Sequence, residues 1–145
     1  MGREVVGGDC WWQTGPYEAD LAVAFRRAQE DELDKDDRGF PGRTIDELWR
    51  SEDWAEYIFT GGTATVLDQV RTVDATEPET GPYMRPLTEE EVRAWCPHGK
   101  PTAAEWTAAL GADLDLFPSR GLGRCTVLYE GGEPTRIGYW GVTAD

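Results

Sequence analysis

The stretch RCTVLYEGGEPTRIGYWGVT, residues 124–143, decides the fold of this chain. On both sides of a central Gly-Gly-Glu-Pro segment, apolar residues recur at every second position, at Cys125, Val127 and Tyr129 and again at Ile137 and Tyr139. This alternation is typical of half-buried strands, and the segment between them is typical of a tight turn. The stretch therefore predicts a C-terminal β-hairpin.

Three helices are predicted ahead of the hairpin by one shared motif. The Thr-x-x-Glu capping box occurs at residues 44–47, 88–91 and 102–105. In such a box the threonine hydroxyl accepts a hydrogen bond from a first-turn amide, and the glutamate accepts one from the threonine amide. Each box therefore predicts the first residue of a helix.

The longest helix is expected to begin near Pro16 and to run to about Lys35. An apolar stripe at helical spacing supports it, formed by Leu21, Ala24, Phe25 and Ala28. Residues 64–73 are rich in Thr, Val and Leu and predict a strand, as does the segment around Trp11. Residues 74–86 hold three prolines and a glycine and predict a surface connection.

These elements predict a single α+β domain over residues 1–145. We expect a small antiparallel sheet of three or four strands that ends in the C-terminal hairpin and is covered on one face by helices.

The charge is strongly negative, with 28 acidic and 14 basic residues and a formal net charge of −14. Such a surface repels nucleic acid phosphates and anionic lipids and attracts basic proteins. We therefore expect a basic protein partner, no nucleic acid and no membrane. Residues 1–9 lack the apolar core of a signal peptide, and no apolar run approaches the ~20 residues that span a bilayer. The expected location is the cytoplasm.

The acid excess is concentrated in residues 30–37, at the predicted end of the long helix. Carboxylates are disfavoured there because the helix dipole is negative at that end. Five of them are candidate binding residues: Glu30, Asp31, Asp34, Asp36 and Asp37. Trp11 and Trp12 complete the candidate set, since adjacent residues of a strand face opposite sides and one indole is expected on the surface.

Four residues are potential zinc ligands: Cys10, Cys96, His98 and Cys125. The spacing speaks against a site, because structural zinc ligands usually come in close pairs such as C-x-x-C. Cys96 and His98 are also a possible nucleophilic pair, although nothing around them resembles a cysteine-enzyme signature. We expect free thiols, no cofactor and no metal, and whether the four residues converge in space is left open.

A calcium loop starting at Asp34 is the remaining metal hypothesis. It lacks a ligand at two positions of the motif, where Arg38 and Ile45 stand. A solvated acidic surface is the better interpretation.

The order of elements resembles that of a group of small uncharacterised proteins of GC-rich, actinobacterial-type bacteria. The resemblance covers most of the chain and is carried by residues 16–20, 44–48, 62–68, 86–92, 101–102 and 127–134. No function is assigned to that group, so the resemblance implies no activity and no catalytic residues.

Two functions remain as expectations. The first is an acidic protein-binding module, such as an immunity-like or antitoxin-like inhibitor of a basic partner. The alternative is a small enzyme or small-molecule-binding protein of specialised metabolism, with a pocket lined by Trp and Tyr and a carboxylate as base. A deep apolar pocket that holds a carboxylate of raised pKa would favour the alternative.

Overall fold

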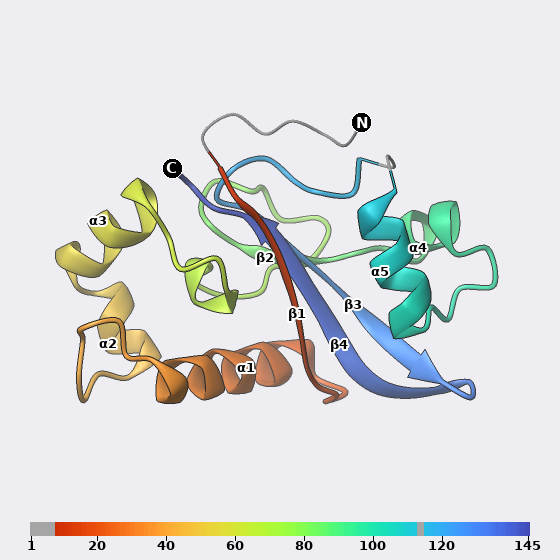
Figure 1. Cartoon of the computed structure of the whole chain (residues 1–145), viewed down its shortest axis with the longest axis horizontal. Coiled ribbons are helices and arrows are strands. Elements are labelled where there is room, and N and C mark those ends of the chain that lie inside the picture. The colour runs from red at the N-terminus through yellow and green to blue at the C-terminus, as the bar shows by residue number, and fades with distance from the viewer. Residues whose placement is uncertain (1–7, 113–114) are drawn as a thin grey trace.

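The predicted hairpin forms the centre of the sheet in the computed structural model, which describes residues 8–112 and 115–145 (Figure 1). Strands β3 (Gly123–Glu130) and β4 (Glu133–Val142) pair antiparallel, and β1 (Cys10–Pro16) pairs antiparallel with the other side of β4. β2 (Met84–Pro86) pairs parallel with β3, which gives the strand order β1-β4-β3-β2. The α+β class and the hairpin are confirmed; residues 1–7, used above to exclude a signal peptide, lie outside the described part.

The three capping boxes are confirmed as helix starts. They precede α2 (Ile45–Trp49), α4 (Glu89–Trp95) and α5 (Ala103–Gly111), and both hydrogen bonds of each box are present. α3 (Glu52–Thr60) follows α2 directly.

The long helix α1 (Leu21–Lys35) begins later than predicted. Asp20 is its N-cap, and its carboxylate accepts from the amide of Ala22 at 2.9 Å. Pro16 instead ends β1, where it pairs with Arg136 of β4. The apolar stripe was read correctly, because Ala24, Phe25 and Ala28 are buried, but the helix could not be extended back through a strand.

The predicted strand over residues 64–73 is wrong. Its centre is the 3-10 helix η1 (Val66–Asp68), and only Thr72 makes an isolated bridge, to Met84. Successive side chains of η1 enter different clusters: Val66 packs with Phe25, and Leu67 packs with Trp54. The apolar residues Val66 and Leu67, which suggested a strand, therefore lie in a helical turn that buries both side chains. The following connection, residues 74–86, is a surface loop as predicted up to residue 83, and its last three residues form β2.

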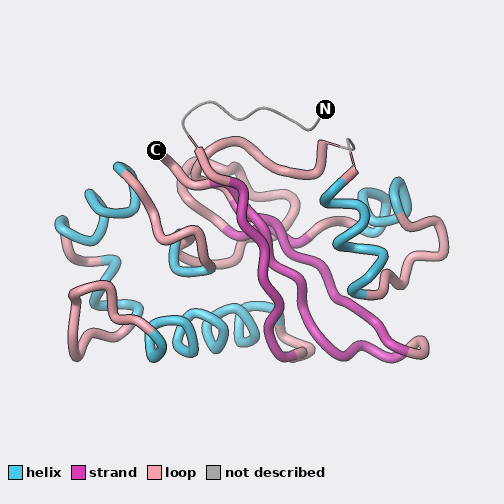
Figure 2. The backbone as a smooth tube through the Cα atoms, viewed as in Figure 1, coloured by secondary structure: helices cyan, strands magenta, loops and turns pink. Residues whose placement is uncertain are grey.

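Helices lie on both faces of the sheet, which corrects the expectation of one covered face (Figure 2). On one face, Ile137 and Tyr139 of β4 pack with Phe25 of α1. On the other face, Trp140 of β4 packs with Trp106 of α5. β4 is consequently buried on both sides from residue 137 to residue 142.

A third cluster explains much of the aromatic excess. Trp54 of α3 is fully buried and makes edge contacts with Phe40 and Trp49 at centroid distances of 5.2 and 6.1 Å. The cluster joins α2 and α3 to Leu67 of η1. Among the described residues, no helix has the length and apolarity needed to cross a membrane.

The close approach of Trp106 to β4 yields a test of the double-sided packing. A Cβ atom at Gly138 would lie 2.8 Å from Cε2 of Trp106. We expect Gly138→Ala to lower the free energy of unfolding by about 1–3 kcal/mol, the usual cost of overpacking, measured by urea denaturation.

The matched control for this change is Gly111→Ala in α5, where an added Cβ meets nothing within 4 Å. The same substitution should raise the free energy of unfolding there by about 0.4–1 kcal/mol, because alanine has less backbone freedom to lose. Equal effects of the two substitutions would contradict the packing of α5 on β4.

Candidate functional site

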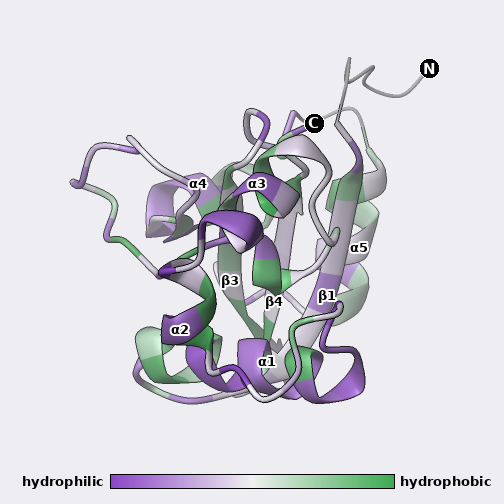
Figure 3. Cartoon of the chain, turned by 90° about the vertical axis from the view of Figure 1, so that its left-hand side faces the viewer, coloured by the Kyte–Doolittle hydropathy of each residue, from purple (hydrophilic) through white to green (hydrophobic). Residues whose placement is uncertain are grey.

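The predicted acidic residues occupy the last turns of α1 and the loop after it. Glu30, Asp31 and Asp34 lie on the helix, Asp36 is its C-cap residue, and Asp37 follows. All five are exposed. Figure 3, which views the molecule from the side of α2 and α3, shows the hydrophilic character of this part of the chain.

Two of the five carboxylates have a local structural role that sequence analysis missed. Asp36 accepts a hydrogen bond from the amide of Arg38 at 2.9 Å, and Asp37 accepts one from the amide of Gly39 at 3.0 Å. Such bonds to the backbone two residues ahead stabilise tight turns. They let Arg38 and Gly39 adopt φ values of 57° and 86°. Asp36 and Asp37 therefore shape the loop that ends α1.

The other three carboxylates have no such role. Within residues 8–112 and 115–145, the side chains of Glu30, Asp31 and Asp34 make no hydrogen bond and no ion pair. Glu30 and Asp34 are four residues apart on one helix, a like-charged spacing that costs about 0.2–0.5 kcal/mol. These three residues are the unpaired acidic surface of α1.

The acidic surface borders shallow grooves. Asp34 lies where three of them meet, with volumes of about 950, 430 and 500 Å³. Val23 of α1 lines the largest groove and is 52% exposed, a high value for an aliphatic side chain. Arg26 and Arg27 also line it, but their charges are paired with Asp46 and Glu18 at 3.1 Å. Arg43 lines the groove without an ion pair among the described residues. The surface thus combines an apolar centre with a net excess of unpaired acid.

The two predicted tryptophans are separated by the sheet. Trp11 is only 5% exposed and packs in the core beneath α1, so its side chain is not part of a surface. Trp12 is 56% exposed and points to the opposite face, as the alternation of β1 requires. Neither indole joins the acidic surface, and the predicted set of seven residues does not form one site.

The four potential zinc ligands do not converge. Cys96 and His98 lie together after α4, with 3.3 Å between Sγ and Nε2. Cys10 of β1 and Cys125 of β3 are not part of the group of potential ligands around them, although Cys125 lines the same groove as His98. Burial raises the pKa of the Cys125 thiol to about 12, which keeps it protonated. Glu105 lies beside Cys96 and His98 and completes a group of three potential metal ligands, although sequence analysis interpreted it only as a capping residue. Among the described residues, no metal-ligand group involves the acidic run.

Asp68 is the described carboxylate whose pKa is raised, because it is buried in η1. Its oxygens accept from the amide and hydroxyl of Thr63, at 2.6 and 2.7 Å, and from the amide of Ala64 at 3.1 Å. Asp68 is only 2% exposed and does not line the grooves beside α1. Its hydrogen bonds to Thr63 and Ala64 hold the loop before η1.

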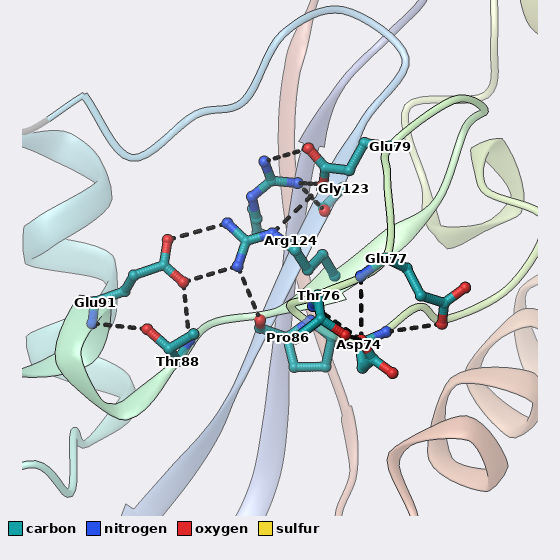
Figure 4. Close-up of polar contacts among 10 residues, drawn as sticks. Asp74, Thr76, Glu77, Glu79, Pro86, Thr88, Glu91, Gly123 and Arg124 are labelled. Carbon is teal, nitrogen blue, oxygen red and sulfur yellow. Dashed lines mark hydrogen bonds and ion pairs between the residues drawn. The ribbon is translucent and has the colours of Figure 1, made fainter.

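A network of arginines and glutamates joins β2, β3 and α4 (Figure 4). Arg85 of β2 binds both carboxylate oxygens of Glu91 at 2.8 and 3.0 Å, and Arg124 of β3 binds those of Glu79 at 2.6 and 3.1 Å. Each guanidinium is balanced by a carboxylate, so the network offers no free charge to an anionic ligand. It is a structural tie between α4 and the edge of the sheet.

Comparison with known proteins adds no assignment: no protein-family model, no curated protein and no solved structure matches the chain. The resemblance described above stays a prediction.

The Arg85–Glu91 pair predicts an acid dependence of stability. The hydrogen bonds from Arg85 lower the pKa of Glu91 from 4.5 to about 2. Because the folded-state pKa is depressed, this pair stabilises the fold above about pH 4.5, and the contribution is lost as the pH falls through about 2. Glu91→Gln retains a capping side chain but removes the charge. Its urea midpoint should fall below that of the wild type at pH 7, and the difference should close between pH 4.5 and pH 2.

Glu90→Gln is the control, since Glu90 is exposed on the same helix turn and makes no ion pair among the described residues. Its urea midpoint should stay close to that of the wild type at every pH. A Glu91 difference that persists unchanged at pH 2 would contradict the ion-pair explanation.

Proposed function

We propose that the chain is an acidic protein-binding module that docks a basic partner on the exposed side of α1. An immunity-like or antitoxin-like inhibitor of a basic enzyme is the kind of protein that we infer. The observation that carries the proposal is the unpaired acidic surface of Glu30, Asp31 and Asp34 beside an exposed apolar side chain, Val23.

The energetic argument starts from the placement of the charges. Like charges on one helix face, near its negative end, lower helix stability. A basic partner turns this repulsion into attraction, because its cations meet carboxylates that have no ion-pair partner among the described residues. Complementary charge of this kind raises association rates by ten- to a thousandfold at low salt.

Apolar side chains beside the carboxylates add surface that a partner can bury, which charge alone does not provide. Protein interfaces typically surround a small apolar centre with a polar rim. Val23 and Ala22 line the largest groove between α1 and the start of α2, and Glu30 and Asp34 lie on the same groove. A basic side chain from a partner can extend its aliphatic stem along Val23 while its charge points toward Glu30, which lies two turns further along α1.

The alternative function has less support. A small enzyme or small-molecule-binding protein needs a carboxylate of raised pKa in an accessible apolar pocket. Asp68 has the raised pKa, but hydrogen bonds within its own loop occupy its oxygens. The open grooves along α1 are better suited to a protein surface than to a small ligand.

The proposed setting is the cytoplasm. Cys10, Cys96 and Cys125 form no disulfide among the described residues, although Cys10 is exposed. Cysteines that stay outside disulfides fit a reducing compartment better than an oxidising one.

The proposal is tested by capturing the partner at a defined position. A photo-crosslinking residue replaces Val23, and the chain is produced in its native cells. The captured protein is purified, and its association rate with the wild type is measured at several salt concentrations. We expect a basic protein whose association slows as salt rises, and a drop of roughly tenfold or more at low salt for the Glu30→Lys, Asp31→Lys, Asp34→Lys variant.

The matched control reverses three exposed carboxylates elsewhere: Glu90, Glu130 and Glu133. It changes the net charge equally but leaves α1 intact, so its effect on association should be much smaller. An acidic partner, equal effects of the two triple variants, or equal capture from a crosslinker at Glu133 would refute the proposal.

A further inference from the structure

A cysteine, a histidine and a glutamate meet where α4 gives way to α5, away from the acidic end of α1. Cys96 is the C-cap of α4, and its amide donates to the carbonyl of Val92 at 2.8 Å. The amide of Gly99 donates to the carbonyl of Cys96 at 2.9 Å, and Gly99 adopts a φ of 81°. This turn brings the ring of His98 back toward the thiol of Cys96.

The third side chain is held from the other helix. Glu105 is the capping glutamate of α5, and its Oε1 accepts from the amide of Thr102 at 3.0 Å. This bond leaves Oε2 directed at His98, with 2.8 Å between Oε2 and Nε2. The capping box therefore fixes one carboxylate oxygen and presents the other.

The three atoms have the separation of metal ligands. Sγ of Cys96, Nε2 of His98 and Oε2 of Glu105 all lie within 4.8 Å of one another, with 3.3 Å between Sγ and Nε2. Ligand atoms around a tetrahedral zinc ion lie roughly 3.3–3.7 Å apart, given bonds of about 2.0–2.3 Å. His98 and Glu105 are 54% and 41% exposed at the side chain, so both can move by the few tenths of an ångström required.

We propose that Cys96, His98 and Glu105 form a zinc site with three protein ligands. One sulfur, one nitrogen and one oxygen donor suit Zn²⁺, whereas Ca²⁺ and Mg²⁺ prefer oxygen ligands alone. Water takes the fourth position. The net charge of −14 favours uptake of a divalent cation from solution.

The proton balance of binding follows from the hydrogen bonds. Nδ1 of His98 accepts from the amide of Lys100 at 3.3 Å, so the neutral ring carries its proton on Nε2 and donates it to Glu105. The ion takes the place of that proton between Nε2 and Oε2. The ring is then protonated on Nδ1, which releases the long bond to Lys100. Cys96 binds as the thiolate, and its proton passes to solvent.

A simpler explanation is a surface His–Glu pair beside an unrelated thiol. Titration of the full chain with Co²⁺ distinguishes the two. The zinc site predicts one equivalent of Co²⁺ bound with a sulfur-to-cobalt charge-transfer band in the near ultraviolet, and loss of this band when Zn²⁺ is added. Zn²⁺ should also raise the Tm of the wild type.

Three variants remove one ligand each. Cys96→Ser should abolish the charge-transfer band, and His98→Ala should abolish the rise in Tm with Zn²⁺. Glu105→Gln retains the capping hydrogen bond and should weaken Co²⁺ affinity about tenfold or more. Circular dichroism establishes that each variant is folded; where one is not, the other two still decide.

Two matched controls use residues of the same kind outside the cluster. Cys10→Ser removes an exposed thiol of β1, and Glu47→Gln changes the equivalent capping glutamate of α2. Both should bind Co²⁺ as the wild type does. The proposal is overturned by the absence of a band at millimolar Co²⁺, by a band that survives Cys96→Ser, or by unchanged affinity in Glu105→Gln. None of these outcomes bears on the acidic surface of α1.

Discussion

The structure depends on the burial of β4 from both sides. The backbone of β4 is hydrogen-bonded to β1 on one side and to β3 on the other, while its side chains alternate between two buried clusters. Tyr139 faces α1, and Trp140 faces α5. Gly138 has no side chain because the indole of Trp106 occupies that space. The strand therefore ties two helical layers into one unit, and disturbing either layer exposes the same strand.

This arrangement also separates the two candidate sites. The unpaired acidic surface belongs to the layer of α1, and the Cys96–His98–Glu105 group belongs to the layer of α4 and α5 on the other face (Figure 1). Leu21, at the start of α1, shares a groove with His98, but Glu30, Asp31 and Asp34 lie at the other end of the helix. A partner on these carboxylates and an ion at α4–α5 therefore occupy different surfaces. Each can be removed by substitution without altering the other.

Local hydrogen-bond chemistry was predictable from the sequence, and tertiary choices were not. A capping box needs only four residues, so the starts of α2, α4 and α5 could be inferred from threonine and glutamate alone. The β3–β4 hairpin was equally local. The prediction of a strand around Val66 and Leu67 was wrong because strand-like composition does not reveal that the two adjacent side chains are buried in different clusters. The helices on both faces of the sheet could not be predicted for a similar reason. The alternation of residues in β4 does not show whether either face of the strand meets solvent.

For the candidate sites too, the sequence predicted which residues lie close together in the chain but not their contacts in the fold. These contacts reduce the number of acidic residues that are available to a partner. The sequence located the acidic run but could not tell that Asp36 and Asp37 bind the backbone of their own loop. It paired Cys96 with His98 but gave Glu105 only a capping role, although one carboxylate has two oxygens and can do both. Within the acidic run, Glu30, Asp31 and Asp34 are the carboxylates without a side-chain contact to another described residue. A helix that keeps these like charges loses stability, and a cationic surface placed against them converts that loss into attraction.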